Sequence, residues 1–302
     1  MFIFKKQQKI VEVGGVKIGG QPGENPVVLA GGVFFRGQPI VEDPVKGSFK
    51  EDLLNQWLNE LNRAMDLTGL PGLIEVYAET PQAMVKHISW IADHWNGPLA
   101  FESPSPEARM AGVRYVAEAG LQGRAVFNSI NPATSSEELR LIEESRIKAA
   151  IALSWQPEAV TLRDRLNVVK VQVARCEKAN VKDVIVDPAS LPVGMGYGSE
   201  WRVSLTVKAL VGLPVCVGAY NAPSSWKLYK DLKSKEVARA SIVAAAVTAA
   251  ILSGVDLVFY GSLARCREVY AAAALIEHGV VEAVSEALRE AGIDRKLYTL
   301  KV

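Results

Sequence analysis

Short apolar runs, each followed by a stretch with helical periodicity, recur along the chain. Eight runs rich in β-branched and aromatic residues predict strands. They cover residues 27–35, 73–80, 98–103, 125–130, 149–155, 183–188, 214–220 and 257–261. Their starts are about 25 to 45 residues apart, which leaves room for one helix and two loops between neighbours.

Helices are predicted after each run. The segments are 49–67, 81–95, 106–119, 135–145, 162–179, 200–211, a long one ending near Ser253, and 264–291. Thr80 before Pro81 and Ser105 before Pro106 are typical N-caps with proline at the first helical position. Ser135 with Glu138 resembles a capping box.

Strands that are apolar on both faces and alternate with helices predict a parallel sheet covered by helices. Eight such units favour a closed (β/α)₈ (TIM) barrel in one domain spanning residues 1–302. Before the first strand, residues 10–13 and 16–18 flank Gly14-Gly15, the pattern of a two-residue β-hairpin. We expect this hairpin to close the barrel floor.

Composition narrows the functional classes. The 302 residues carry 34 Lys and Arg against 33 Asp and Glu, so the net charge of +1 does not favour nucleic-acid binding. Three widely spaced cysteines predict neither a disulfide framework nor a metal site. The N-terminus does not have the pattern of a signal peptide, and no apolar run is long enough to span a bilayer. We therefore expect a cytoplasmic protein without membrane contact.

The active site of a (β/α)₈ barrel lies at the C-terminal ends of its strands. These ends carry Glu102, Asn128, Ser129, Asp187 and Asn221, with no lysine, histidine or cysteine among them. This argues against a Schiff-base enzyme and a metal site. Carboxylates and carboxamides suit a ligand with clustered N–H donors, such as a 2-aminopyrimidinone edge. The alternative is that Glu102 and Asp187 cap helices or pair with arginines.

Glycines follow the sixth strand in the stretch Leu191-Pro192-Val193-Gly194-Met195-Gly196. Such a loop lets a ligand approach the backbone, so Gly194 and Gly196 are candidate binding residues. A flexible connector explains them equally well. The spacing matches neither a dinucleotide-binding nor a Walker motif.

Four segments together resemble the H-subunit family of tetrahydromethanopterin S-methyltransferase, from about residue 2 to about residue 270. They are Ile18-Gly19-Gly20-Gln21-Pro22-Gly23-Glu24, Ser105-Pro106-Glu107-Ala108-Arg109, Asn128-Ser129-Ile130-Asn131 and Tyr220-Asn221-Ala222-Pro223-Ser224. The resemblance implies methyl transfer between a corrinoid and N5 of a tetrahydropterin. It implies a bacterial stand-alone branch that uses tetrahydrofolate, as in glycine betaine demethylation, with tetrahydromethanopterin as the alternative pterin.

The resemblance also implies residue roles. Glu102, Asn128, Asp187 and Asn221 fall where related folate barrels hold the pterin. Glu102 stands where the pattern usually has Asp and is a methylene longer, so its direct contact with the pterin stays open. Asp187 is expected to anchor the aminopyrimidinone edge, and Asn221 to act at N5.

The partners follow from the same resemblance. The chain has no Asp-x-His-x-x-Gly stretch, the usual lower-ligand signature for cobalamin. The corrinoid is therefore expected on a second protein that docks at the barrel mouth, while a homodimer is the ordinary expectation for this chain. Two alternatives remain: a dihydropteroate synthase-like enzyme, and a non-catalytic pterin-binding subunit of a larger complex.

Overall fold

The computed structural model describes residues 3–232 and 235–300. Its central sheet has eight parallel strands with the neighbour order β10-β9-β8-β7-β6-β3-β12-β11. In chain order the strands are β3 (Val28–Val33), β6 (Gly72–Tyr77), β7 (Leu99–Glu102), β8 (Ala125–Ile130), β9 (Ala149–Leu153), β10 (Asp183–Asp187), β11 (Cys216–Gly218) and β12 (Leu257–Ser262).

The sheet closes on itself between its two end strands. Val186 of β10 forms a parallel bridge with Val215, which directly precedes β11. The Val186 amide donates to the Pro214 carbonyl at 2.8 Å. The predicted (β/α)₈ barrel is thus confirmed.

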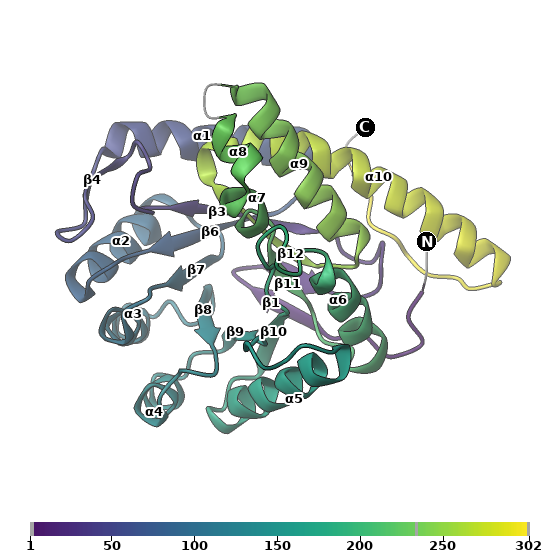
Figure 1. The fold of residues 1–302 in the computed structure, drawn as a ribbon, viewed down its shortest axis with the longest axis horizontal. Coiled ribbons are helices and arrows are strands. Elements are labelled where there is room, and N and C mark those ends of the chain that lie inside the picture. Colours follow the sequence, from purple (N-terminus) through teal and green to yellow (C-terminus); the bar gives the residue numbers. More distant parts are fainter. Residues whose placement is uncertain (1–2, 233–234, 301–302) are drawn as a thin grey trace.

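Helices surround the strands (Figure 1). They are α1 (Glu51–Thr68), α2 (Pro81–His94), α3 (Pro106–Glu118), α4 (Ser136–Glu144), α5 (Leu162–Lys178), α6 (Ser199–Leu210), α7 (Asn221–Ser225), α8 (Lys227–Asp231), α9 (Glu236–Leu252) and α10 (Cys266–Glu290). A 3₁₀ turn, η1 (Leu263–Arg265), leads into α10.

Local sequence explains where several helices begin. Thr80 and Ser105 cap α2 and α3 through their side chains, each with proline at the start of the helix. Ser135 and Glu138 form a capping box at α4. Each motif satisfies backbone N–H groups that have no partner in the first helical turn. The capping motifs predicted from the sequence therefore mark where α2, α3 and α4 begin.

The N-terminal hairpin consists of β1 (Ile10–Val13) and β2 (Val16–Gly19), paired antiparallel. Val11, Val13 and Ile18 are buried in the same cluster as the inward-facing strand residues. The Gly14 amide also donates to the carbonyl of Gly123, which precedes β8. The hairpin thus packs into the end of the barrel where the strands start, as predicted.

Two apolar cores lie on opposite faces of the barrel wall. The inner one consists mainly of alternate strand residues, among them Ala30, Leu73, Ala100, Val126 and Ile185. The other strand positions face the helices and form the larger outer core. Because side chains alternate along a strand, the residue two positions after each inner residue also points into the barrel, one layer closer to its mouth.

Three expectations about boundaries are wrong. The helix predicted over 49–67 begins at Glu51, because Ser48 and Phe49 form β5, which pairs with β4 (Val41–Asp43) in a second hairpin. The strand predicted over 214–220 is regular only over Cys216–Gly218. The helix predicted from residue 264 begins as the 3₁₀ turn η1.

Of the helices in the described ranges, none is both long and apolar enough to cross a membrane.

Candidate functional site

Three carboxyl side chains meet at the C-terminal end of the barrel. Leu73, Ala100 and Ile185 belong to the inner core. Two residues further along the same strands stand Glu75, Glu102 and Asp187. The two-residue period of a strand points all three carboxyls inward, above the apolar layer.

Asn128 of β8 connects two of these carboxyls. Its Nδ2 atom donates to Glu75 Oε1 at 3.1 Å and to Glu102 Oε2 at 3.3 Å. Glu102 and Asn128 come from neighbouring strands, whereas Glu75 lies one strand further away. We call Glu75, Glu102, Asn128 and Asp187 the mouth cluster.

The mouth cluster is poor in positive charge. Burial raises the pKa of Glu75 well above its ordinary value, and the carboxyl of Glu102 raises it further. Burial and then Asp187 raise the pKa of Glu102 to about 7. Burial raises the pKa of Asp187 to about 6, although its backbone hydrogen bond and Arg165 lower it. Raised pKa values of this kind are typical of carboxyls at binding and catalytic sites, where burial disfavours the charged form.

Asp187 is held by the loop that follows its strand. Its Oδ1 atom accepts a hydrogen bond from the Ala189 amide at 2.7 Å. Arg165 donates to the Pro188 and Ala189 carbonyls, so the guanidinium secures the loop backbone. The alternative that Asp187 serves as a local cap is partly realised, but it involves only one of the two carboxylate oxygens.

Asn221 follows β11 and is exposed at the start of α7. Its side chain lies over Gly218: a Cβ atom at that glycine would be only 2.6 Å from Asn221 Nδ2. Tyr220, not Asn221, is the residue before the helix, and it makes no side-chain cap. The geometry therefore does not support a capping role for Asn221.

Other predicted binding residues lie around the mouth without joining the mouth cluster. Ser129 is buried, and its carbonyl accepts from the Asn131 and Thr134 side chains. Gly194 and Gly196 lie in the exposed loop between β10 and α6, both with positive φ. That φ favours glycine for conformational reasons alone, which supports the connector interpretation of these residues.

Glu75 is a site residue that the strand-end pattern does not reveal. It lies inside a predicted strand rather than at its end. The signal that could have found it is the charge itself: a single glutamate in an apolar strand, two residues before Tyr77 and therefore on the same face. It is only 7% exposed.

An aromatic pair forms one wall of the mouth. Phe35 and Tyr77 stack with ring centroids 4.5 Å apart. Beside them Arg36 pairs with Glu79 at 2.5 Å. Gly32 makes room for this packing, since a Cβ there would lie 2.7 Å from Phe35 and 3.0 Å from Glu75 Oε2.

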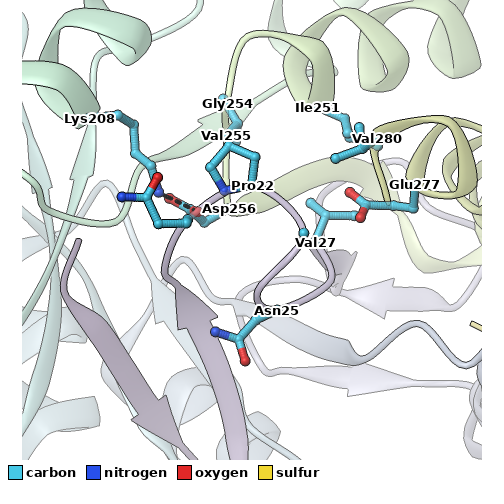
Figure 2. A pocket seen from close by; sticks show the side chains of 12 residues that line it. Pro22, Asn25, Val27, Lys208, Ile251, Gly254, Val255, Asp256, Glu277 and Val280 are labelled. Carbon is cyan, nitrogen blue, oxygen red and sulfur yellow. Dashed lines mark hydrogen bonds and ion pairs between the residues drawn. The ribbon is translucent and has the colours of Figure 1, made fainter. Parts of the chain in front are cut away.

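A small enclosed cavity lies at the opposite end of the barrel (Figure 2). Pro22, Asn25, Lys208, Asp256 and Glu277 line it, and Lys208 pairs with Asp256 at 2.7 Å. Its volume of about 30 Å³ has room for one or two water molecules rather than a bicyclic ligand. We therefore place the candidate site at the mouth cluster.

The cysteines and His87 are buried rather than exposed at the mouth cluster. The three cysteines are buried, and burial raises the thiol pKa of Cys176 to about 12 and of Cys266 to about 11. His87 stacks on Phe34 at 3.8 Å, and burial lowers its pKa to about 4. Among residues 3–232 and 235–300, no group of three or more His, Cys, Asp or Glu side chains could hold a metal ion.

Sequence comparison relates the chain to known proteins. Residues 6–295 match the family described as tetrahydromethanopterin S-methyltransferase MtrH subunit. The H subunit of the tetrahydromethanopterin S-methyltransferase from Methanocaldococcus jannaschii is 35% identical, with 95% of each chain covered. That of Methanothermobacter marburgensis is 33% identical, over 99% of this chain and all of the relative.

Structural comparison identifies the same barrel in another group of proteins. A dihydropteroate synthase from Yersinia pestis, solved with a pterin-sulfa conjugate, superposes with a TM-score of 0.59 at 16% identity, covering 93% of this chain and all of that one. The synthase from Xanthomonas albilineans with 7,8-dihydropteroate gives 0.57 at 15% identity, covering 91% and 98%. At such identity the likeness concerns the fold.

Proposed function

Because the chain belongs to the H-subunit family of tetrahydromethanopterin S-methyltransferase, we propose that it transfers a methyl group between a protein-bound corrinoid and N5 of tetrahydrofolate. The pterin is held in the mouth cluster. The observation that carries this proposal is the set of one buried carboxyl (Glu75), two half-buried carboxyls (Glu102 and Asp187) and one carboxamide at the C-terminal end of the barrel.

The chemistry of the cluster fits a pterin. An aminopyrimidinone presents a ring N–H and an amino group side by side, and one carboxylate can accept both hydrogen bonds. Asp187, with a pKa of about 6, is largely ionised at neutral pH. Burying it against two N–H donors compensates the desolvation that raises its pKa. We assign Asp187 as the anchor, with Asn128 and Glu102 beside it.

In the transfer, the bond between the methyl carbon and cobalt breaks while the N5–carbon bond forms. The cobalt keeps the electron pair, and N5 loses its proton. The protein needs no nucleophile of its own, because its contribution is the alignment of two bound substrates. Asn221 is assigned to N5, where its carboxamide can accept and donate hydrogen bonds as the proton leaves to water.

The stand-alone, tetrahydrofolate-using branch is part of the proposal. The relatives are named for tetrahydromethanopterin, so the two pterins must be compared directly. We further propose a cytoplasmic homodimer that docks a corrinoid protein over the mouth. Light scattering of the purified chain tests the dimer, and cell fractionation tests the compartment.

A dihydropteroate synthase-like reaction is the rival on the same fold. It requires cations for a pterin diphosphate, and Arg109 and Arg202 are the candidates. The Arg109 guanidinium is buried, pairs with Glu138 at 2.7 Å and donates to the Ser103 carbonyl. The engagement of Arg109 argues against the rival, and Arg202 on α6 is exposed rather than placed at the mouth cluster.

The deciding experiment uses the purified chain with methylcobalamin and either tetrahydrofolate or tetrahydromethanopterin. With tetrahydrofolate we expect methyltetrahydrofolate to form and the absorbance of methylcobalamin to fall. Both changes should be faster with tetrahydrofolate than with tetrahydromethanopterin. A faster reaction with tetrahydromethanopterin would overturn the proposed branch. Transfer to neither pterin, also after addition of a methylated corrinoid protein, would favour the non-catalytic role in a larger complex.

A further inference from the structure

Both N–H groups of the Asn128 carboxamide face carboxyl groups. A carboxamide has two N–H donors on nitrogen and one acceptor oxygen. Nδ2 reaches Glu75 Oε1 at 3.1 Å and Glu102 Oε2 at 3.3 Å. With the nitrogen oriented by two acceptors, the Asn128 Oδ1 atom is the one that can accept from a ligand.

Glu75 contributes the shorter of these two hydrogen bonds from a strand that does not adjoin β8. Gly32 on the neighbouring strand β3 lies against this carboxyl. A Cβ atom at Gly32 would be only 3.0 Å from Glu75 Oε2, so the glycine provides the space that the carboxyl occupies. Among residues 3–232 and 235–300, Asn128 is the one side chain that hydrogen-bonds to the Glu75 carboxyl. A buried acceptor beside an amide favours the orientation in which the amide nitrogen, the donor, faces it.

The charge balance agrees with this role. Burial raises the pKa of Glu75 well above the ordinary value, and the charges of Glu102 and Asp187 raise it further, while the Asn128 hydrogen bond lowers it. The shift favours the protonated form of Glu75 over what an exposed glutamate would show. A protonated carboxyl can still accept the Asn128 hydrogen bond.

We propose that Glu75 is a positioning residue for pterin recognition: it holds the Asn128 carboxamide so that Oδ1 accepts an N–H of the heterocycle. This inference rests on the proposed function. It deepens that function by naming a residue that works through Asn128 rather than by touching the methyl group. Glu75 then affects the affinity for the pterin and leaves the transfer rate at saturation unchanged.

A double-mutant cycle tests the assignment. The variants are Glu75→Ala, Asn128→Ala and the double variant, with tetrahydrofolate affinity measured by calorimetry. We expect Glu75→Ala to weaken binding at least about tenfold when Asn128 is present, and less than about twofold in the Asn128→Ala background. The rate at saturating pterin should stay within about twofold of the parent.

Glu75→Gln provides the conservative rescue. Glutamine has the size and neutrality of a protonated glutamate and retains an acceptor oxygen, so affinity should remain within about threefold of the parent. Glu79→Gln is the matched control beyond the mouth cluster, since Glu79 pairs with Arg36. If Glu75→Ala does not fold, Glu75→Leu removes the acceptor while nearly keeping the volume.

Two outcomes would overturn the assignment. Equal losses in both Asn128 backgrounds would mean that Glu75 acts independently. A loss in Glu75→Gln as large as in Glu75→Ala would mean that an ionisable group is required. Failure of the proposed function is distinguishable, because the unsubstituted protein would then bind no pterin, and the assignment to pterin recognition would be overturned with it.

Discussion

Asn128 Nδ2 lies 3.1 Å from Glu75 Oε1, although β7 separates the strands that carry these two residues. The contact therefore passes across the inside of the barrel, above the apolar layer that includes Ala100. It joins a carboxamide and a carboxyl that both stand at the fourth residue of their six-residue strands. The consequences for binding, rate and stability can each be measured.

Replacing Asp187 by alanine should weaken tetrahydrofolate binding at least about tenfold. The carboxylate is expected to accept two charge-assisted hydrogen bonds, each worth roughly 1.5–3 kcal/mol, and tenfold corresponds to about 1.4 kcal/mol. Calorimetric titration measures the change. Asp183→Ala is the control, because Asp183 lies at the opposite end of β10 beside Lys9. Unchanged affinity in folded Asp187→Ala would refute the anchor.

Replacing Asn221 by alanine should slow methyl transfer at least about tenfold while tetrahydrofolate affinity is kept. This is the pattern of an interaction made mainly in the transition state. Single-turnover kinetics with methylcobalamin provide the measurement. Ser225→Ala on the same short helix, whose hydroxyl donates to the Ala222 carbonyl, should leave the rate unchanged. A parent-like rate in Asn221→Ala would exclude the catalytic role.

Glu102→Gln should stabilise the protein at high pH. The native pKa of about 7 lies above the ordinary value of 4.5, so the folded state holds a proton that the unfolded state releases. Stability from this group is present below about pH 4.5 and is lost as the pH rises to about 7. Glutamine removes this loss, which is roughly 1–3 kcal/mol.

Urea denaturation of the parent and Glu102→Gln at pH 4.5 and pH 8 checks this sign. The variant should gain at pH 8 and gain much less at pH 4.5. A difference that does not depend on pH would show that Glu102 ionises alike in both states. The same variant should bind pterin less tightly if Glu102 contacts it directly.

Lys208→Met should destabilise the fold by roughly 3–5 kcal/mol, since it leaves Asp256 buried without its cation. Lys208 Nζ lies 2.7 Å from Asp256 Oδ1 and 2.9 Å from the Gly20 carbonyl, and its side chain is 2% exposed. Lys227→Met breaks the exposed pair with Asp231 and should cost less than about 1 kcal/mol. Similar denaturation midpoints for both variants would contradict this contrast.

The sequence by itself determined the eight strands, most helix starts and four of the polar residues at the mouth. These features depend on short-range rules: a two-residue period decides which face a side chain takes, and Thr80 or Ser105 satisfies backbone donors three residues away. Glu102 and Asp187 could be found because each ends its strand. Asn128 and Asn221 could be found because each lies in the last part of a predicted strand or directly after one.

Only the tertiary structure decided how the barrel closes and which side chains meet. The bridge between Val186 and Val215 joins segments about thirty residues apart, and Asn128 reaches Glu75 from 53 positions away. The pairing of Ser48 and Phe49 with residues 41–43 likewise overrides a helical pattern that extended two residues too far. Such contacts depend on packing across the whole barrel, whose free energy no local pattern contains.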